Sequence, residues 1–203
     1  MTEASAPIVA FDFDGTLTVR DSFTAFLAWR VTPGRHLAGL ARLAPAVIGY
    51  LRHRDRGRLK AAAVREFLRG LPRATLQAEA LAFARANSAQ LLRPDALETW
   101  RRWGLRGARR IIVTASPEIT VAPFARDLGA DALIGTLLGF NAEDHVTGGF
   151  VGENCRAEEK VRRLRNLFGP DVRLAAAYGD TSGDHAMLGI AEEKGYRVFK
   201  ERP

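Results

Sequence analysis

Short apolar segments alternate with helical patterns along most of this 203-residue chain. Each segment is bounded by charges or turn residues, as is typical of strands in a parallel sheet that is covered on both faces. The predicted strands are Ile8–Asp12, Arg110–Thr114, Arg173–Tyr178 and Tyr196–Phe199, and the predicted helices among them are Pro117–Leu128, Ala157–Phe168 and Asp184–Lys194. This alternation predicts an α/β fold with a doubly wound parallel sheet.

Two stretches depart from this alternation. Residues 21–93 show only helical patterns, and they are too many for a single crossover, so we expect a small helical domain inserted into a core of residues 1–20 and 94–203. Its expected helices are Phe23–Val31 with Ser22 as the cap, His36–Arg54, Arg58–Arg69 and Arg73–Leu92. Ala132–Gly152 contains two apolar runs around the letters NAED, which predicts a β-hairpin that leaves the main sheet.

Two acidic residues, Asp12 and Asp14, interrupt the first apolar segment in the letters IVAFDFDGTLT. Their spacing of two puts both side chains on one face of a strand, and Gly15 permits a sharp turn at the carboxyl end. Ligands bind at that edge in open α/β sheets. Two carboxylates at about 4 Å repel by about 4 kcal/mol with an effective dielectric near 20, so we expect a cation between them.

A second pair of acids, Asp180 and Asp184, follows the third predicted strand in the letters YGDTSGDHAML. Because the carboxyl ends of parallel strands meet at one edge of the sheet, this pair is expected near the first. The four acids offer oxygen ligands, and no cysteine or histidine cluster accompanies them. This composition favours a hard cation, Mg²⁺ rather than Zn²⁺.

Two further positions suit an anion. Thr114, in the letters IIVTAS, is expected where the second strand ends, so that its hydroxyl and the following N–H of Ala115 point at a ligand near a helix start. An ordinary helix cap by Thr114 or Ser116 would give the same letters. Lys160, in CRAEEKVRRL, has no local feature that distinguishes it from a solvated helix lysine.

Taken in order, the four motifs resemble those of the haloacid dehalogenase (HAD) superfamily, and the match spans the whole chain. The insertion directly after the first motif resembles the helical cap of the phosphoserine-phosphatase-like branch, subfamily IB. Within that branch, the letters DFDGTLTVRDSFTAFLAWR, VTASPE and NCRAEEK are similar to the phosphatidylglycerophosphatase C type.

The resemblance implies a phosphatase and assigns its catalytic roles. Asp12 would attack phosphorus and form an aspartyl-phosphate. Asp14 would protonate the leaving alcohol and then activate the water that hydrolyses the intermediate. Thr114, Ala115 and Lys160 would hold the phosphoryl oxygens.

The resemblance also implies a bound Mg²⁺. Its ligands would be Asp12, Asp180 and the backbone carbonyl of Asp14, while Asp184 would hold the waters of the metal. With an aspartate at the position of Asp14, a phosphatase is favoured over a dehalogenase or a phosphonatase.

The substrate stays open at this level. Phosphoserine phosphatases have an acidic residue at the position of Asp21, which could meet an ammonium group, but the Gly-Gly pair usual after their second motif is missing from TASPE. The apolar stretch Leu37–Leu51 is flanked by basic residues and interrupted by Arg42 and Pro45. It is too short to span a bilayer. It is either an interfacial segment on an anionic membrane, which would suit a lipid-headgroup phosphate such as phosphatidylglycerophosphate, or a buried helix of the inserted domain.

The net charge of +7 and the pI of about 10.3 favour anionic partners. A basic anion- or nucleic-acid-binding protein is therefore the non-enzyme alternative, although no recognition motif is present and no nucleic acid is expected. The single cysteine, Cys155, forms no internal disulfide. Met1–Pro7 lacks the features of a signal peptide, so we expect a cytoplasmic protein, and the interfacial alternative for Leu37–Leu51 adds peripheral contact with an anionic membrane.

Overall fold

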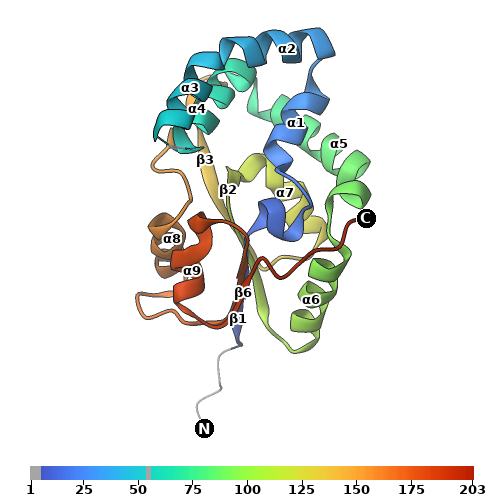
Figure 1. The fold of residues 1–203 in the computed structure, drawn as a ribbon, viewed down its shortest axis with the longest axis vertical. Helices are drawn as coiled ribbons and strands as arrows, with labels where there is room; N and C mark the ends of the chain where they lie inside the picture. Colours follow the sequence, from blue (N-terminus) through green and yellow to red (C-terminus); the bar gives the residue numbers. More distant parts are fainter. Residues whose placement is uncertain (1–5, 54–55) are drawn as a thin grey trace.

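The structure is a computed structural model that describes residues 6–53 and 56–203, and it is built on a six-stranded sheet in the order β4-β3-β2-β1-β5-β6 (Figure 1). The strands are β1 (Ile8–Phe11), β2 (Arg109–Pro117), β3 (Ala132–Phe140), β4 (Val146–Val151), β5 (Leu174–Gly179) and β6 (Ala191–Tyr196). All neighbours are parallel except β3 and β4. The predicted fold class is confirmed.

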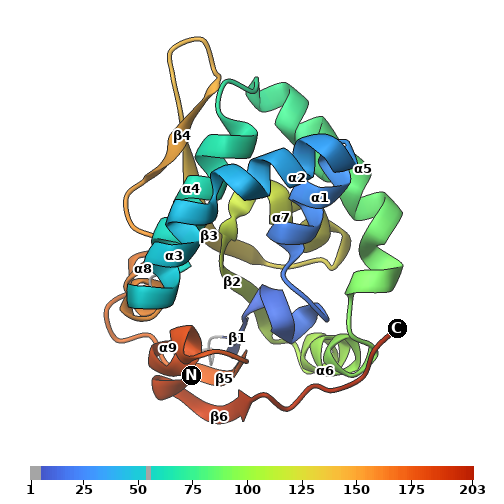
Figure 2. The same cartoon turned by 45° about the horizontal axis from the view of Figure 1, so that its top comes forward.

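Helices cover both faces of the sheet (Figure 2). On one side lie α6 (Pro94–Leu105) and α7 (Glu118–Asp127), and on the other α8 (Glu158–Phe168) and α9 (His185–Gly189). Successive side chains of β1 point to opposite faces of the sheet, so this strand contributes to the apolar core on each face. Phe11 packs with Trp100 and Phe124 in one core, and Ala10 packs with Leu164 and Met187 in the other.

Five further helices stand over the carboxyl edge of the sheet: α1 (Ser22–Arg30), α2 (Pro33–Arg42), α3 (Ala44–His53), α4 (Arg56–Leu68) and α5 (Arg73–Leu91) (Figure 1). Helix α5 packs on α7, and the rings of Phe83 and Phe124 lie 6.1 Å apart. The apolar cluster beneath these helices is therefore continuous with one core of the sheet. Among residues 6–53 and 56–203, no helix has both the length and the apolar character needed to cross a bilayer.

Two details of the helical segment differ from prediction. The single helix expected at 36–54 is two helices, because the chain breaks at Leu43 and Pro45 cannot donate a helix-interior hydrogen bond. The cap of α1 is Asp21, whose Oδ1 accepts from Thr24 N at 2.6 Å, so Ser22 is the first helical residue instead. The expected helix end at position 54 lies outside the described residues.

The last strand also differs from prediction. Strand β6 covers Ala191–Tyr196 rather than 196–199, and α9 ends at Gly189 rather than reaching position 194. Three consecutive charged residues of β6, at positions 192–194, are exposed. Edge strands commonly carry such charges, so a search for apolar runs passed over this strand.

The predicted hairpin is present as β3 and β4, but it does not leave the sheet as expected. The first part of β3 pairs in parallel with β2, with Ala132 opposite Ile111, and its later part pairs with β4. Because β3 is nine residues long, it serves both partners. Strand β4 in turn packs against α4.

Candidate active site

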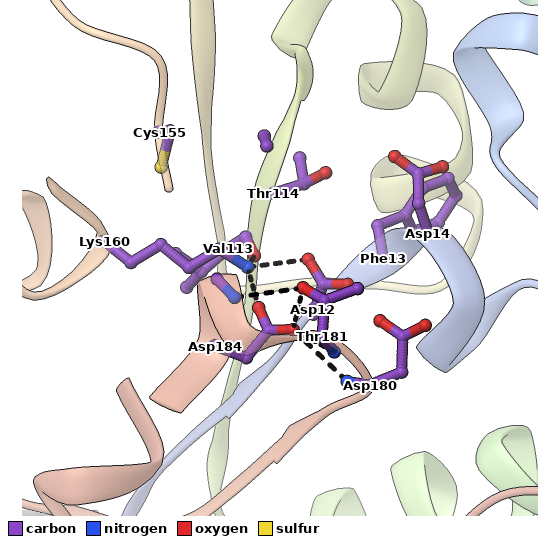
Figure 3. Close-up of polar contacts among 12 residues, drawn as sticks. Asp12, Phe13, Asp14, Val113, Thr114, Cys155, Lys160, Asp180, Thr181 and Asp184 are labelled. Atoms are coloured by element: carbon purple, nitrogen blue, oxygen red, sulfur yellow. Dashed lines mark hydrogen bonds and ion pairs between the residues drawn. The ribbon is translucent and has the colours of Figure 1, made fainter. Parts of the chain in front are cut away.

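Three of the four predicted acids, Asp12, Asp180 and Asp184, meet at the carboxyl edge of the sheet (Figure 3). Asp12 directly follows β1, Asp180 directly follows β5, and Asp184 ends the short turn before α9. Lys160 reaches the same place from α8, and Thr114 lies on β2, which runs three residues beyond the predicted strand end. Four separate segments of the chain thus supply one cluster.

Lys160 lies at the centre of this cluster. Its side chain is 1% exposed, and its Nζ donates at 2.6 Å to each of three acceptors, Asp12 Oδ1, Asp184 Oδ1 and the carbonyl of Val113. Burial opposes the charge, but the two carboxylates outweigh it and raise the pKa of Lys160 above its usual value. The residue is a buried, fully partnered cation, so the solvated-lysine interpretation is wrong.

Asp12 is buried among like charges. Burial raises the pKa of Asp12 to about 8, and Asp184 and Asp14 add to this rise while Lys160 opposes it. One lysine therefore does not fully compensate the negative charge gathered here. Additional positive charge at this place would favour the ionised, nucleophilic form of Asp12.

The carboxylates fit a metal ion. Asp12, Asp180 and Asp184 can each place an oxygen so that all three lie within 4.8 Å of one another. The Oδ1 atom of Asp180 is buried and has no hydrogen-bond partner among the described residues. A buried acceptor without a donor is costly, and burial together with Asp184 raises the pKa of Asp180. An all-oxygen donor set with one orphaned oxygen suits Mg²⁺.

Gly15 allows the turn after Asp12 to pass close to Asp180. Its φ of +82° lies in the region that favours glycine, and a Cβ at this position would collide with Asp180 Oδ2. Both constraints act at a single residue. The glycine of the first motif is therefore explained by the approach of backbone to carboxylate.

Asp184 has both carboxylate oxygens occupied by protein donors. Lys160 binds Oδ1, while Oδ2 accepts from the backbone N–H of Asp180 and from the N–H and hydroxyl of Thr181. Burial would raise the pKa of Asp184, but Lys160 and Thr181 outweigh it and lower the pKa. The side chain thus braces the loop that carries Asp180.

Asp14 lies apart from this group and faces the helical segment (Figure 3). Its Oδ1 accepts from Ser22 N at 2.7 Å and from Ser22 Oγ at 2.6 Å, and its Oδ2 accepts from Ser116 Oγ. Burial and the nearby Asp21 raise the pKa of Asp14. The two acids of the first motif therefore have different surroundings: Asp12 lies with Asp180 and Asp184, and Asp14 lies under α1.

The part of β2 after Val113 is held by hydrogen bonds within itself and to neighbouring segments. Thr114 is fully buried, and its Oγ1 accepts from Ser116 N at 3.0 Å. The carbonyl of Ala115 accepts from Thr136 Oγ1 at 3.0 Å and from Lys60 Nζ at 3.3 Å. Thr114 and Ala115 thus follow Val113, whose carbonyl accepts from Lys160, and Ser116 links them to Asp14.

Sequence reasoning missed Lys60, and it assigned no role at the site to Ser22 or Ser116. Lys60 projects from α4 to within 3.0 Å of Ser116 Oγ and 3.9 Å of Asp21 Oδ2. One signal was available, because Lys60 is the only lysine in the arginine-rich stretch 21–93. Asp21, predicted as a substrate contact, caps α1 and lines the same cavity with its side chain 44% exposed.

A cavity of about 670 Å³ connects the cluster with the helical segment. Its base is the carboxylate floor, defined here as Asp12, Asp180 and Asp184 with Lys160. Its walls include apolar side chains from α1, α2, α3 and α4 and from the break between α2 and α3, namely Leu27, Leu40, Leu43, Val47 and Phe67. The cavity therefore joins a strongly polar end to an apolar one.

Comparisons with known proteins agree with the assignment of this site to a hydrolase. The chain belongs to the haloacid dehalogenase-like hydrolases, whose family model matches residues 9–189. It is 61% identical to Protein CicA of Caulobacter vibrioides over 196 residues, which make up 97% of this chain and 88% of that protein, and the value is the same in two strains.

Two solved structures show the same fold. A protein of unknown function from Bordetella pertussis Tohama I superposes with a TM-score of 0.76 at 22% identity, covering 92% of this chain and 87% of that one. A phosphoserine phosphatase, solved as a phospho-aspartyl intermediate analogue, superposes with a TM-score of 0.62 at 21% identity, covering 94% and 86%. The predicted superfamily is confirmed.

Proposed function

We propose that this hydrolase is a Mg²⁺-dependent phosphatase that cleaves a phosphate monoester through an aspartyl-phosphate on Asp12. The observation that carries the proposal is the carboxylate floor, in which Asp12 is paired with a buried lysine and lies beside the orphaned oxygen of Asp180. A nucleophilic carboxylate needs its repulsion from a phosphate dianion removed, and this floor gathers the groups that do so.

In the proposed reaction, an oxygen of Asp12 forms a bond to phosphorus as the bond from phosphorus to the leaving oxygen breaks. Asp14 gives its proton to that oxygen and later takes one from the attacking water. Lys160, held at 2.6 Å from Asp12, offsets the negative charge, and Thr114 and Ala115 on β2 would donate to the phosphoryl oxygens.

We assign the metal to Asp12, Asp180 and the backbone carbonyl of Asp14, with Asp184 in support. When bound, Mg²⁺ supplies Lewis-acid charge neutralisation at the phosphoryl group. The orphaned oxygen of Asp180 supports this assignment. So does Asp184, whose oxygens are already taken by Lys160, Thr181 and a backbone N–H.

We further propose that residues 21–93 act as a cap over the core of residues 1–20 and 94–203. The helices of this segment stand over the carboxyl edge of the sheet and line the cavity. A cap in this place would exclude water from the phosphoryl group and choose the substrate.

The cap favours a phosphorylated lipid headgroup, such as that of phosphatidylglycerophosphate, as the substrate. Helices α2 and α3 expose an apolar face made of Leu37, Leu40, Val47, Ile48 and Leu51, which are 39–69% exposed. This finding contradicts the interpretation of the stretch as a buried helix, although Leu43 is buried. Leu40 and Val47 also line the cavity, so the apolar face continues inward toward the carboxylate floor.

The charge around the apolar face suits an anionic membrane surface. Residues 22–53 contain no acidic residue, and the side chain of Arg42 is 63% exposed. Each basic residue near such a surface adds about 1 kcal/mol of attraction. We propose that the apolar face rests on the membrane while the phosphorylated headgroup enters the cavity.

A small-metabolite phosphatase, with phosphoserine as the first example, is the second candidate. It is favoured by the partly exposed carboxylate of Asp21 in the cavity, which could meet an ammonium group. Lys60 lies 3.9 Å from that carboxylate and competes for it, which is why the lipid phosphate is placed first.

The decisive test is release of phosphate from p-nitrophenyl phosphate by the wild-type protein with Mg²⁺. Chelation of divalent ions should abolish turnover, and Mg²⁺ should restore it. Asp12→Asn should abolish turnover while leaving the circular-dichroism spectrum and melting temperature near those of the wild type. Absence of turnover on any phosphate ester, with folded protein and Mg²⁺ present, would refute the proposal.

A screen then separates the two substrate classes. It compares phosphoserine in solution with phosphatidylglycerophosphate in mixed vesicles, at matched phosphate concentration. A preference for phosphoserine would replace the lipid proposal with the small-metabolite one, and Asp21→Asn would then raise KM for phosphoserine.

A further inference from the structure

Lys60 connects the cap to the core at the active site. Its side chain extends from α4 and is only 15% exposed, although lysine is almost always exposed in proteins. Its Nζ donates to Ser116 Oγ at 3.0 Å and to the carbonyl of Ala115 at 3.3 Å. It also lies 5.7 Å from the centre of the Phe23 ring.

The chemistry of Lys60 sets the direction of the next hydrogen bond. An ammonium group can only donate, so Ser116 Oγ must accept from Lys60. The single hydroxyl proton of Ser116 is then directed to Asp14 Oδ2, the other partner of that oxygen. A run of hydrogen bonds with one fixed direction therefore leads from Lys60 through Ser116 to Asp14.

The other oxygen of Asp14 is held in the same manner. The backbone N–H of Ser22 is an obligate donor at 2.7 Å, and the Ser22 hydroxyl is 2.6 Å away. Donors on both oxygens fix the plane of the carboxyl group. Two of the three side chains involved, Ser22 and Lys60, belong to the cap, so the cap itself sets the orientation of Asp14.

We propose that Lys60 is a positioning residue for Asp14, acting through Ser116. This inference rests on the proposed phosphatase function, in which Asp14 transfers its proton to the leaving oxygen as the phosphorus–oxygen bond breaks. Without Lys60, the Ser116 hydroxyl is free to turn toward other acceptors and the carboxyl of Asp14 loses its fixed plane. Proton transfer is sensitive to such geometry, and a well-placed acid contributes about 10²- to 10⁴-fold to the rate.

A pair of substrates exposes this role. Phenyl phosphate and p-nitrophenyl phosphate are close in shape, but the nitrophenolate ion leaves without a proton, whereas phenolate needs one. Lys60→Met should lower kcat for phenyl phosphate about tenfold more than kcat for p-nitrophenyl phosphate, with KM little changed. Ser116→Ala should do the same, the double variant should lose no more than either alone, and Lys60→Arg should restore part of the rate.

Lys194→Met, on the exposed edge strand β6, is the matched control and should keep wild-type rates on both esters. Melting temperatures verify that each variant is folded. Equal loss on both esters, or a change confined to KM, would overturn the role of Lys60 and show instead a substrate contact or a structural link. Wild-type protein inactive on both esters would overturn the phosphatase proposal, and this inference with it.

Discussion

One cavity joins the carboxylate floor to the apolar face, yet their side chains meet opposite conditions. In the floor, Asp12, Asp184 and Lys160 are buried and bound to one another, with three acceptors around Lys160. On the apolar face, Leu37 and Ile48 remain 69% and 65% exposed. Stability accounts for neither arrangement, since buried charge and exposed leucine are both unfavourable. Under the proposed function, an ion and a phosphoryl group at one end and a lipid surface at the other would account for both arrangements.

The largest effect is expected from the floor. Lys160→Met leaves Asp12 and Asp184 buried without their shared cation, which should lower the free energy of unfolding by about 3–5 kcal/mol. Activity should fall below detection. Urea unfolding and phosphate release measure the two effects, with Lys194→Met as the control. If the Lys160→Met protein were active and stable, the carboxylate floor would not depend on its buried charge, and the contrast with the apolar face would be wrong.

Gly15→Ala should rank second. The new Cβ meets both an unfavourable φ, which costs about 1–3 kcal/mol, and the carboxylate of Asp180. Displacing the carboxylate of Asp180, a proposed metal ligand, should reduce turnover by about a hundredfold. Gly70→Ala is a matched control, because Gly70 has the same φ of +82° with nothing within 4 Å of its Cβ position. Similar loss of activity in both variants would show that strain, rather than contact with Asp180, matters.

On the apolar face, substitutions should leave stability nearly unchanged but should weaken membrane binding. Combined Leu37→Ser, Ile48→Ser and Leu51→Ser should change stability by no more than about 0.5 kcal/mol per site. Sedimentation with phosphatidylglycerol vesicles at low salt should weaken at least tenfold, because burial of each leucine or isoleucine contributes about 1.5–3 kcal/mol. Leu105→Ser, on α6 and 91% exposed in the wild type, should leave vesicle binding unchanged. Wild-type protein that fails to bind such vesicles would eliminate the membrane proposal.

The smallest effect concerns Cys155, which is fully buried in the apolar core that contains Leu164 and Met187. Burial raises the pKa of its thiol to about 11. At pH 8 only about one thiol in a thousand is ionised, so alkylation should be slow and should accelerate as pH approaches 11. Variants of the apolar face should label at the wild-type rate, and Lys160→Met should label faster. Mass spectrometry after timed iodoacetamide treatment measures the pH dependence of labelling and the labelling rates of the variants.

The sequence predicted the parts of the fold in which local pattern and burial agree. The central strands are apolar, and their existence was predicted. Helices α7 and α8 are bounded by clear stop signals, so the ends of these two helices fall within a residue or two of prediction. Strand β6 was misplaced because an edge strand needs no apolar run, and its pairing to β5 is a long-range property. The break between α2 and α3 depended on Pro45, which the apolar pattern outweighed.

In the candidate site, motif residues were predictable and their partners were not. Asp12, Asp180 and Asp184 follow from strand ends and spacing, and the structure brings them together as expected. The burial of Lys160 and the bond from Lys60 to Ser116 depend on how α8 and α4 pack against the sheet. No local pattern around a lysine reports on such packing.

Strand β3, which serves two partners, also limits how a substrate can enter. The chain after α4 is hydrogen-bonded to the hairpin, with Gly70 N donating to the carbonyl of Val146 and Val146 N to that of Leu71. Since the hairpin continues the main sheet, these hydrogen bonds tie the segment between α4 and α5 to the core. In the proposed cap, opening would therefore fall to α2 and α3, the same helices that would touch a membrane, so that docking and opening would be a single event.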